Sequence, residues 1–137
     1  MQPERTACLI FLLLGALWDI RTRCIHLRLT AAFAALGILL AVVSSRTAGE
    51  VMWALVPGLV LLAASALSRG AIGMGDGITL AVTGLYLDLP EVMFTAGFAF
   101  AGAALMGILM LLLKKRGESF PFLPFLFFGG MAAFMLI

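Results

Sequence analysis

The chain has 137 residues, of which 64% are hydrophobic and 12% are charged, and its formal net charge at pH 7 is +2. Soluble domains contain about 45–50% apolar and about 25% charged residues, so this composition indicates an integral membrane protein with one domain, residues 1–137. The small net charge argues against a nucleic-acid partner. Cys8 and Cys24 fall at opposite ends of the first apolar segment, so we expect two packing residues and no disulfide between them. Because the sequence has no Cys-x-x-Cys pair and no His/Cys cluster, we also expect no metal site.

Six apolar stretches, separated by short polar connections, predict an all-α bundle of about six transmembrane helices in the lipid bilayer. The stretches are Thr6–Trp18, Leu27–Ser44, Val51–Ser68, Gly77–Leu89, Val92–Leu113 and Phe120–Ile137. A spanning helix needs about 20 apolar residues, and four of the stretches approach this length. The first and fourth are shorter, and we expect the ends of these two short helices to border a water-accessible cavity.

Basic residues are distributed unequally between the two ends of this predicted bundle. One end holds Arg21, Arg23, Arg28, Arg69, Lys114, Lys115 and Arg116, and the other holds Arg5 and Arg46. Cytoplasmic loops of membrane proteins carry an excess of lysine and arginine. We therefore expect a multi-pass protein with both termini outside the cytoplasm. Asp19 and Asp76 should then lie at the same depth, at the cytoplasmic boundary.

Pairs of small residues four positions apart predict close contacts between helices, because small side chains let two backbones approach. The pairs are Ala31/Ala35, Ala54/Gly58 and Ala103/Gly107. We expect them to pack within one chain, and a dimer interface is the alternative. Trp18, Trp53 and Tyr86 fall near the predicted membrane boundaries, where aromatic residues act as anchors.

Two acids are the main candidates for chemistry. Asp19 ends the first apolar stretch, and Asp76 lies within the glycine-rich segment Gly73–Gly77. A carboxylate near hydrocarbon costs roughly 2.5–3.5 kcal/mol, so two of them at one depth suggest a reaction site. Boundary charges balanced by neighbouring arginines are the alternative. Because glycine tolerates unusual backbone angles and close approach, a peptide substrate could lie against Gly73 and Gly75.

Two neighbouring carboxylates can share one proton, because both cannot ionise without strong repulsion. One carboxylate then draws a proton from water while the other donates a hydrogen bond to a scissile carbonyl, and the roles exchange as the amine leaves. This hydrolysis needs no metal and no cofactor. Phosphate binding by the glycine-rich segment is excluded, because the lysine and hydroxyl of a P-loop are missing.

Three stretches resemble motifs of the type IV prepilin peptidases, which are membrane aspartyl proteases with a GxGD motif. Asp19–Ile25 and the following residues are similar to the first aspartate motif, Gly73–Asp76 to the second, and Pro121–Phe125 to a Pro-Phe-Gly-Pro segment. The resemblance implies an aspartic-type endopeptidase of the inner membrane with Asp19 and Asp76 as the catalytic pair. Such enzymes cleave basic leaders from prepilins or pseudopilins in pilus assembly and protein secretion.

The chain departs from the family pattern at five positions, and these departures concern substrate preference. They are His26, Leu27, Gly77, Ile78 and Leu123. We expect His26 to be a solvated residue at the start of the second helix, and the two prolines of the C-terminal motif to shape the last helix or line a substrate groove. No cysteine tetrad for the zinc-binding methylation domain of many members is present, so the chain resembles the short, peptidase-only form.

Two other function classes remain open at this point. One is a catalytically inactive scaffold that binds prepilin-like partners. The other is a transporter component that uses both acids as proton or cation sites, although transporters usually have internal repeats and acids at the membrane midplane. The oligomeric state and the identity of the substrate do not follow from the sequence.

Overall fold

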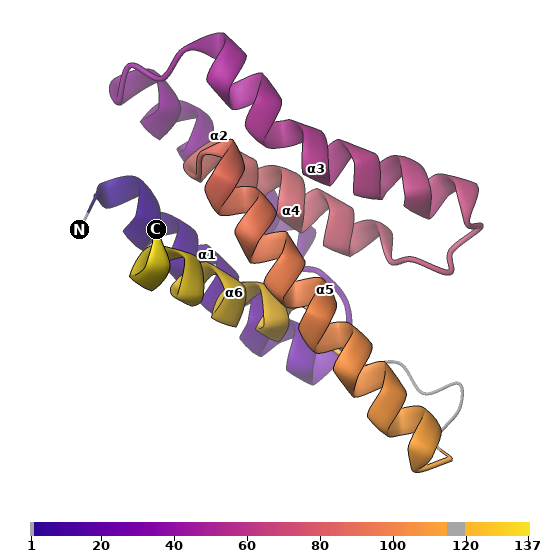
Figure 1. The fold of residues 1–137 in the computed structure, drawn as a ribbon. Coiled ribbons are helices and arrows are strands. Elements are labelled where there is room, and N and C mark those ends of the chain that lie inside the picture. The colour runs from indigo at the N-terminus through magenta and orange to yellow at the C-terminus, as the bar shows by residue number, and fades with distance from the viewer. Residues whose placement is uncertain (1, 115–119) are drawn as a thin grey trace.

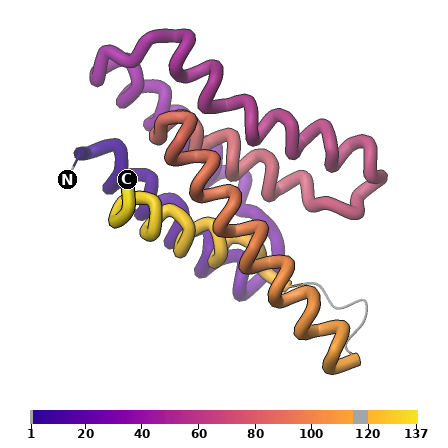
Figure 2. The backbone as a smooth tube through the Cα atoms, in the orientation of Figure 1, coloured from indigo at the N-terminus to yellow at the C-terminus, as the bar shows by residue number. Residues whose placement is uncertain are grey.

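The computed structural model describes residues 2–114 and 120–137, and this part of the chain forms six helices and no strand (Figure 1). The helices are α1 (Pro3–Thr22), α2 (Leu27–Val43), α3 (Ala48–Leu67), α4 (Met74–Tyr86), α5 (Leu89–Leu112) and α6 (Leu123–Leu136). Successive helices run in alternating directions, so that α1 begins and α6 ends at the same end of the bundle (Figure 1, Figure 2). The predicted all-α class is confirmed.

Among the described residues, two helices are long and apolar enough to cross a membrane. These are α3, with 20 residues and a mean hydropathy of 1.9, and α5, with 24 residues and a mean hydropathy of 2.0. Only 22% and 17% of their apolar windows are buried within the chain, whereas a core helix of a soluble protein would be mostly buried. The two helices therefore fit a membrane protein. α2 and α6 are also apolar but shorter.

The helix ends differ from the predicted ends beside the two acids. α1 continues to Thr22 and has 20 residues, so the prediction of a short first helix is wrong. The reason is that backbone hydrogen bonds continue through polar side chains, whereas the apolar run stops earlier. α4 is short, as predicted, with 13 residues. It begins at Met74, however, which places Asp76 in its first turn and not in a connection.

Direct contact between the backbones of α3 and α4 holds α4 in position. A Cβ atom added at Gly58 would overlap the backbone of Ala81, and one added at Gly84 would overlap the carbonyl oxygen of Ala54. Glycine allows this close crossing because no side chain separates the two helices. The predicted contact at Ala54 and Gly58 is thus confirmed.

Three other expectations about helix surfaces are wrong. Ala31 and Ala35 are exposed, and a Cβ atom at Gly107 would meet nothing within 4 Å, so these residues make no close helix contact in the chain. Tyr86 is 2% exposed, so its side chain is not an exposed aromatic anchor on the surface of the chain. Its hydroxyl group donates a hydrogen bond to the carbonyl oxygen of Phe33, which joins α4 to α2. A buried tyrosine needs such a partner for its hydroxyl group.

Charged side chains join the helices at the end of the bundle where α1 begins. Arg5 of α1 forms an ion pair with Glu91 of α5, which is 5% exposed. The Arg5 guanidinium also lies over the ring of Phe134 in α6, 5.5 Å from its centroid. A buried carboxylate is costly without a partner, so this pair ties three helices together.

Candidate active site

One cavity contains both of the predicted catalytic acids. It has a volume of about 580 Å³ and lies at the end of the bundle where α1 ends and α4 and α6 begin. Asp19 and Asp76 both line it, and so do the predicted substrate contacts Gly73 and Gly75. The fold therefore brings together four candidate residues from two distant segments. The family-like C-terminal segment contributes to the same cavity.

Asp19 lies near the end of α1 and is 7% exposed. Its Oδ2 atom accepts a hydrogen bond from the backbone N–H of Leu123 at 3.1 Å. Leu123 is the first residue of α6, and the residue before it supplies no side-chain cap. The first N–H groups of a helix lack intrahelical partners and favour a negative charge. Asp19 therefore caps α6 from a different helix, and this contact positions both the acid and the start of α6.

Leu123, which departs from the family pattern, has a clear structural partner. Its side chain is 3% exposed and packs against α1, where a Cβ atom at Gly15 would lie 2.8 Å from its Cδ2 atom. The missing side chain of Gly15 thus makes room for the leucine. This packing keeps the backbone N–H of Leu123 within reach of Asp19.

The glycines around Asp76 provide room for close contacts. A Cβ atom at Gly75 would lie 2.8 Å from Cγ2 of Ile25, and one at Gly77 would lie 2.8 Å from Cγ of Leu62. The first turn of α4 can therefore pack directly against the α1–α2 connection and against α3. None of these glycines has a positive φ, so the expectation that they supply unusual backbone angles is wrong.

The Asp19 carboxylate acts on Asp76, and both acids lie outside the two membrane-length helices. Burial, together with the nearby Asp19 carboxylate, raises the pKa of Asp76 to about 6. Burial also raises the pKa of Asp19, while the backbone N–H groups of Leu123 and Phe122 act in the opposite direction. In the described part of the chain neither acid forms an ion pair, so the structure does not support balancing by neighbouring arginines. Below about pH 6, Asp76 therefore retains its proton.

His26 is not part of the cavity lining. Its Nδ1 atom accepts a hydrogen bond from the backbone N–H of Leu29 at 3.0 Å, and it is the N-cap of α2. Its ring also contacts the Trp18 ring edge-on, with the centroids 4.6 Å apart. The prediction that His26 lies at the start of the second helix is confirmed, and the residue is half-buried, so that it is only partly exposed to solvent.

Cys24 is a cavity residue that the sequence analysis missed. It is exposed and lines the cavity, so the expectation that it is a packing residue is wrong, whereas Cys8 is buried as expected. Its position in the same motif as Asp19 was the available signal. The two proline-flanked aromatics Phe120 and Phe122 also line the cavity, while Pro124 lies in the first turn of α6. The C-terminal motif therefore both shapes its helix and contributes to the groove.

The structure is that of a helical protein with membrane-length helices and with two carboxyl groups that line one cavity at one end of the bundle. Residues 6–112 match the type IV leader peptidase family, so the chain belongs to this family. Membership implies a type IV leader peptidase-like protease. The matched region includes both acids and ends before the proline-containing motif at the start of α6. Comparisons with curated proteins and with solved structures found no match.

Proposed function

We propose that the protein is a membrane aspartyl endopeptidase that removes the basic leader from prepilin-like or pseudopilin-like substrates, with Asp19 and Asp76 as its catalytic pair. The observation that carries this proposal is the single cavity that both acids line. Family membership supports the protease class. The whole of residues 1–137 would form one peptidase domain, and Gly73 and Gly75 would contact the substrate backbone.

The surroundings of the two acids support a division of roles. The N–H of Leu123 and the start of α6 stabilise a negative charge on Asp19, whereas no hydrogen bond reaches the Asp76 carboxyl group from the residues that the structure describes. Hydrogen bonds to the ionised form favour that form. Asp19 would therefore start as the carboxylate, and Asp76 would hold the shared proton.

The reaction then proceeds in two balanced steps. Asp19 takes a proton from water while protonated Asp76 gives its proton to the scissile carbonyl oxygen, and the new C–O bond forms a neutral tetrahedral diol. Next, Asp19 gives its proton to the leaving nitrogen, and Asp76 recovers a proton from a diol hydroxyl as the C–N bond breaks. The products are a carboxylic acid and an amine, and both acids return to their initial states.

The same proposal gives the protein a multi-pass position in the inner membrane, with the cavity at the cytoplasmic end and both termini outside. The charge distribution supports this orientation. The cavity end carries Arg21, Arg23, Arg28, Arg69 and Lys114, and the opposite end carries Arg5 and Arg46. Lys115 and Arg116 lie outside the described residues. α4 and α6 would not need full membrane length, because the cavity at their starts admits water.

Co-expression with a prepilin tests the proposal. Wild-type protein should shorten the substrate by the length of its leader, and Asp19→Asn and Asp76→Asn should each abolish this change while inserting normally into membranes. Glu4→Gln is a matched control, because Glu4 lies in the first turn of α1, at the opposite end from Asp19. Cleavage that persists in both aspartate variants would refute the catalytic pair. Binding without cleavage by the wild type would indicate a scaffold.

A further inference from the structure

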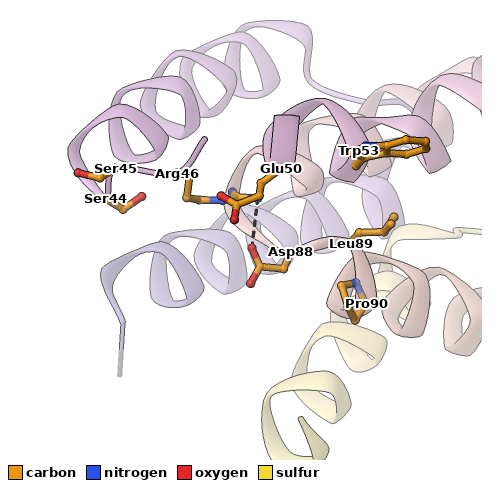
Figure 3. A pocket seen from close by; sticks show the side chains of 8 residues that line it. All are labelled: Ser44, Ser45, Arg46, Glu50, Trp53, Asp88, Leu89 and Pro90. Carbon is orange, nitrogen blue, oxygen red and sulfur yellow. Dashed lines mark ion pairs between the residues drawn. The ribbon is translucent and has the colours of Figure 1, made fainter. Parts of the chain in front are cut away.

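A second polar cavity lies at the opposite end of the bundle from the two acids, between the end of α2 and the starts of α3 and α5 (Figure 3). Its volume is about 820 Å³. The polar side chains that line it are Ser44, Ser45, Arg46, Glu50 and Asp88. In Figure 3 the side chains of Arg46, Glu50 and Asp88 converge, while Trp53 lies at the far side of the cavity. The proposed peptidase chemistry uses none of these residues.

The charges in this cavity do not cancel. The Arg46 side chain is 9% exposed and donates hydrogen bonds to the carbonyl oxygens of Leu85 at 2.8 Å and Leu87 at 3.0 Å. It also lies 3.4 Å from Oδ1 of Asp88, whose side chain is 69% exposed. Its Nε–H is buried and has no partner among the described residues. Because Glu50 also lines the cavity, two carboxylates accompany the single cation Arg46, and the buried Nε–H of this arginine donates no hydrogen bond among the described residues.

An apolar groove continues from this cavity between α3 and α5. It has a volume of about 570 Å³ and shares Trp53 and Leu89 with the polar cavity. Its other lining residues are apolar and reach Ala64 on α3 and Phe100 on α5. From Trp53 to Ala64 the groove follows about 16 Å of helix, which is close to half of the ~30 Å hydrocarbon core. The groove thus has the length of one membrane leaflet.

We propose that this composite site binds one zwitterionic phospholipid whose headgroup carries a primary ammonium group. The ammonium group would lie between Glu50 and Asp88, which supply acceptors and excess negative charge. The phosphate would lie on the side of Arg46 and the hydroxyl group of Ser44, and one acyl chain would occupy the α3–α5 groove. A headgroup with a net negative charge is disfavoured, because the acids outnumber the cation. A quaternary ammonium headgroup lacks the N–H donors that carboxylates prefer.

Conservative variants can remove the charges without removing the helix caps. Glu50 and Asp88 both take part in capping boxes at the starts of α3 and α5. Glutamine at N3 and asparagine at the N-cap retain capping, so Glu50→Gln and Asp88→Asn should fold normally. For the groove, Gly97→Leu fills open space, because a Cβ atom at Gly97 would meet nothing within 4 Å. The site lies away from Asp19 and Asp76, so prepilin cleavage serves as a folding control.

The test uses quenching of Trp53 fluorescence by phospholipids with brominated acyl chains, in purified Trp18→Phe protein in detergent. Phosphatidylethanolamine should quench at a lower mole fraction than phosphatidylcholine or phosphatidylglycerol with the same chains. The double variant Glu50→Gln/Asp88→Asn should weaken the apparent affinity about tenfold, as expected for losing hydrogen bonds to charged groups. Gly97→Leu should weaken quenching by all three lipids.

Equal quenching by the three lipids, or a preference for phosphatidylglycerol, would overturn the proposal. So would quenching that is unchanged in the double variant. Trp53→Phe protein, in which Trp18 reports from the other end of the bundle, should show no preference among the lipids. Retained prepilin cleavage in each variant would separate a failure of the lipid site from a failure of the peptidase proposal.

Discussion

The two ends of the bundle differ in whether their buried charged side chains pair with a group of opposite charge. Where α1 begins, Arg5 pairs with Glu91, and Arg46 donates to two backbone carbonyls and pairs with Asp88. At the other end, Asp19 receives a backbone N–H, but no cation pairs with it or with Asp76 within the described ranges. A buried charge without a counter-ion is unfavourable. The paired charges at the first end stabilise the fold, whereas the two acids at the second end retain a cost that a reaction would explain.

Removing either acid at the cavity end should have the largest effect on activity. Asp19→Asn and Asp76→Asn should each lower the cleavage rate at least ~10³-fold, because a positioned acid or base contributes about 10²–10⁴-fold. Purified protein in detergent and a prepilin substrate give this rate directly. A rate within about tenfold of wild type for either variant would contradict the proposed pair.

Breaking the ion pair at the other end should lower stability and leave the chemistry intact. Arg5→Met leaves Glu91 buried without its partner, and we expect a loss of about 3 kcal/mol in the free energy of unfolding. Chemical denaturation in detergent, alongside Glu4→Gln as a control, measures this loss. The double variant Arg5→Met/Glu91→Gln should recover most of it, because no unpaired charge remains. Equal losses in the single and double variants would show that lost packing, and not the unpaired carboxylate, is the cause.

The stability of the cavity end should depend on pH. The pKa of Asp76 in the folded protein is raised to about 6 from 3.8, so the folded state binds this proton more tightly than the unfolded state. This tighter proton binding stabilises the folded state. The stabilisation is complete below the pKa that Asp76 has in the unfolded chain, and it is lost as pH rises through about 6. Asp76→Asn should therefore be more stable than wild type at pH 8 by about 1–2 kcal/mol, allowing for solvent screening, and not at pH 4. The melting temperatures of the variant and the wild type at both pH values test the sign of this difference in stability.

Labelling of the two cysteines compares the cavity with the packed interior. Its effect on cleavage should be smaller than that of removing either acid. Cys24 lines the cavity and is exposed, whereas Cys8 is buried, so a bulky maleimide should modify Cys24 alone. Modification should slow cleavage about tenfold by filling the substrate space, and Cys24→Ser protein should resist it. Mass spectrometry locates the label. Full activity in labelled wild-type protein would place substrate binding outside this cavity.

Part of this architecture could be predicted because its signals are local. The alternation of apolar stretches and polar connections predicted six helices, and the distribution of arginine and lysine predicted that Asp19 and Asp76 share one end. Hydropathy predicted too short a helix for α1. The hydropathy pattern depends on side chains, whereas backbone hydrogen bonds extend the helix to Thr22. It also suggested a boundary position for Tyr86, which is buried against α2.

By itself, then, the sequence determined the helical class, the order of the helices and the pair of acids, since each depends on the spacing of residue types along the chain. Only the tertiary structure decided which neighbours those residues meet. The capping of α6 by Asp19 joins residues 104 positions apart, and no periodicity encodes it. The contacts that require Gly75 and Gly77 likewise depend on Ile25 and Leu62, which belong to other segments. Such contacts follow from how the helices pack, because packing fixes the distances that local patterns leave open.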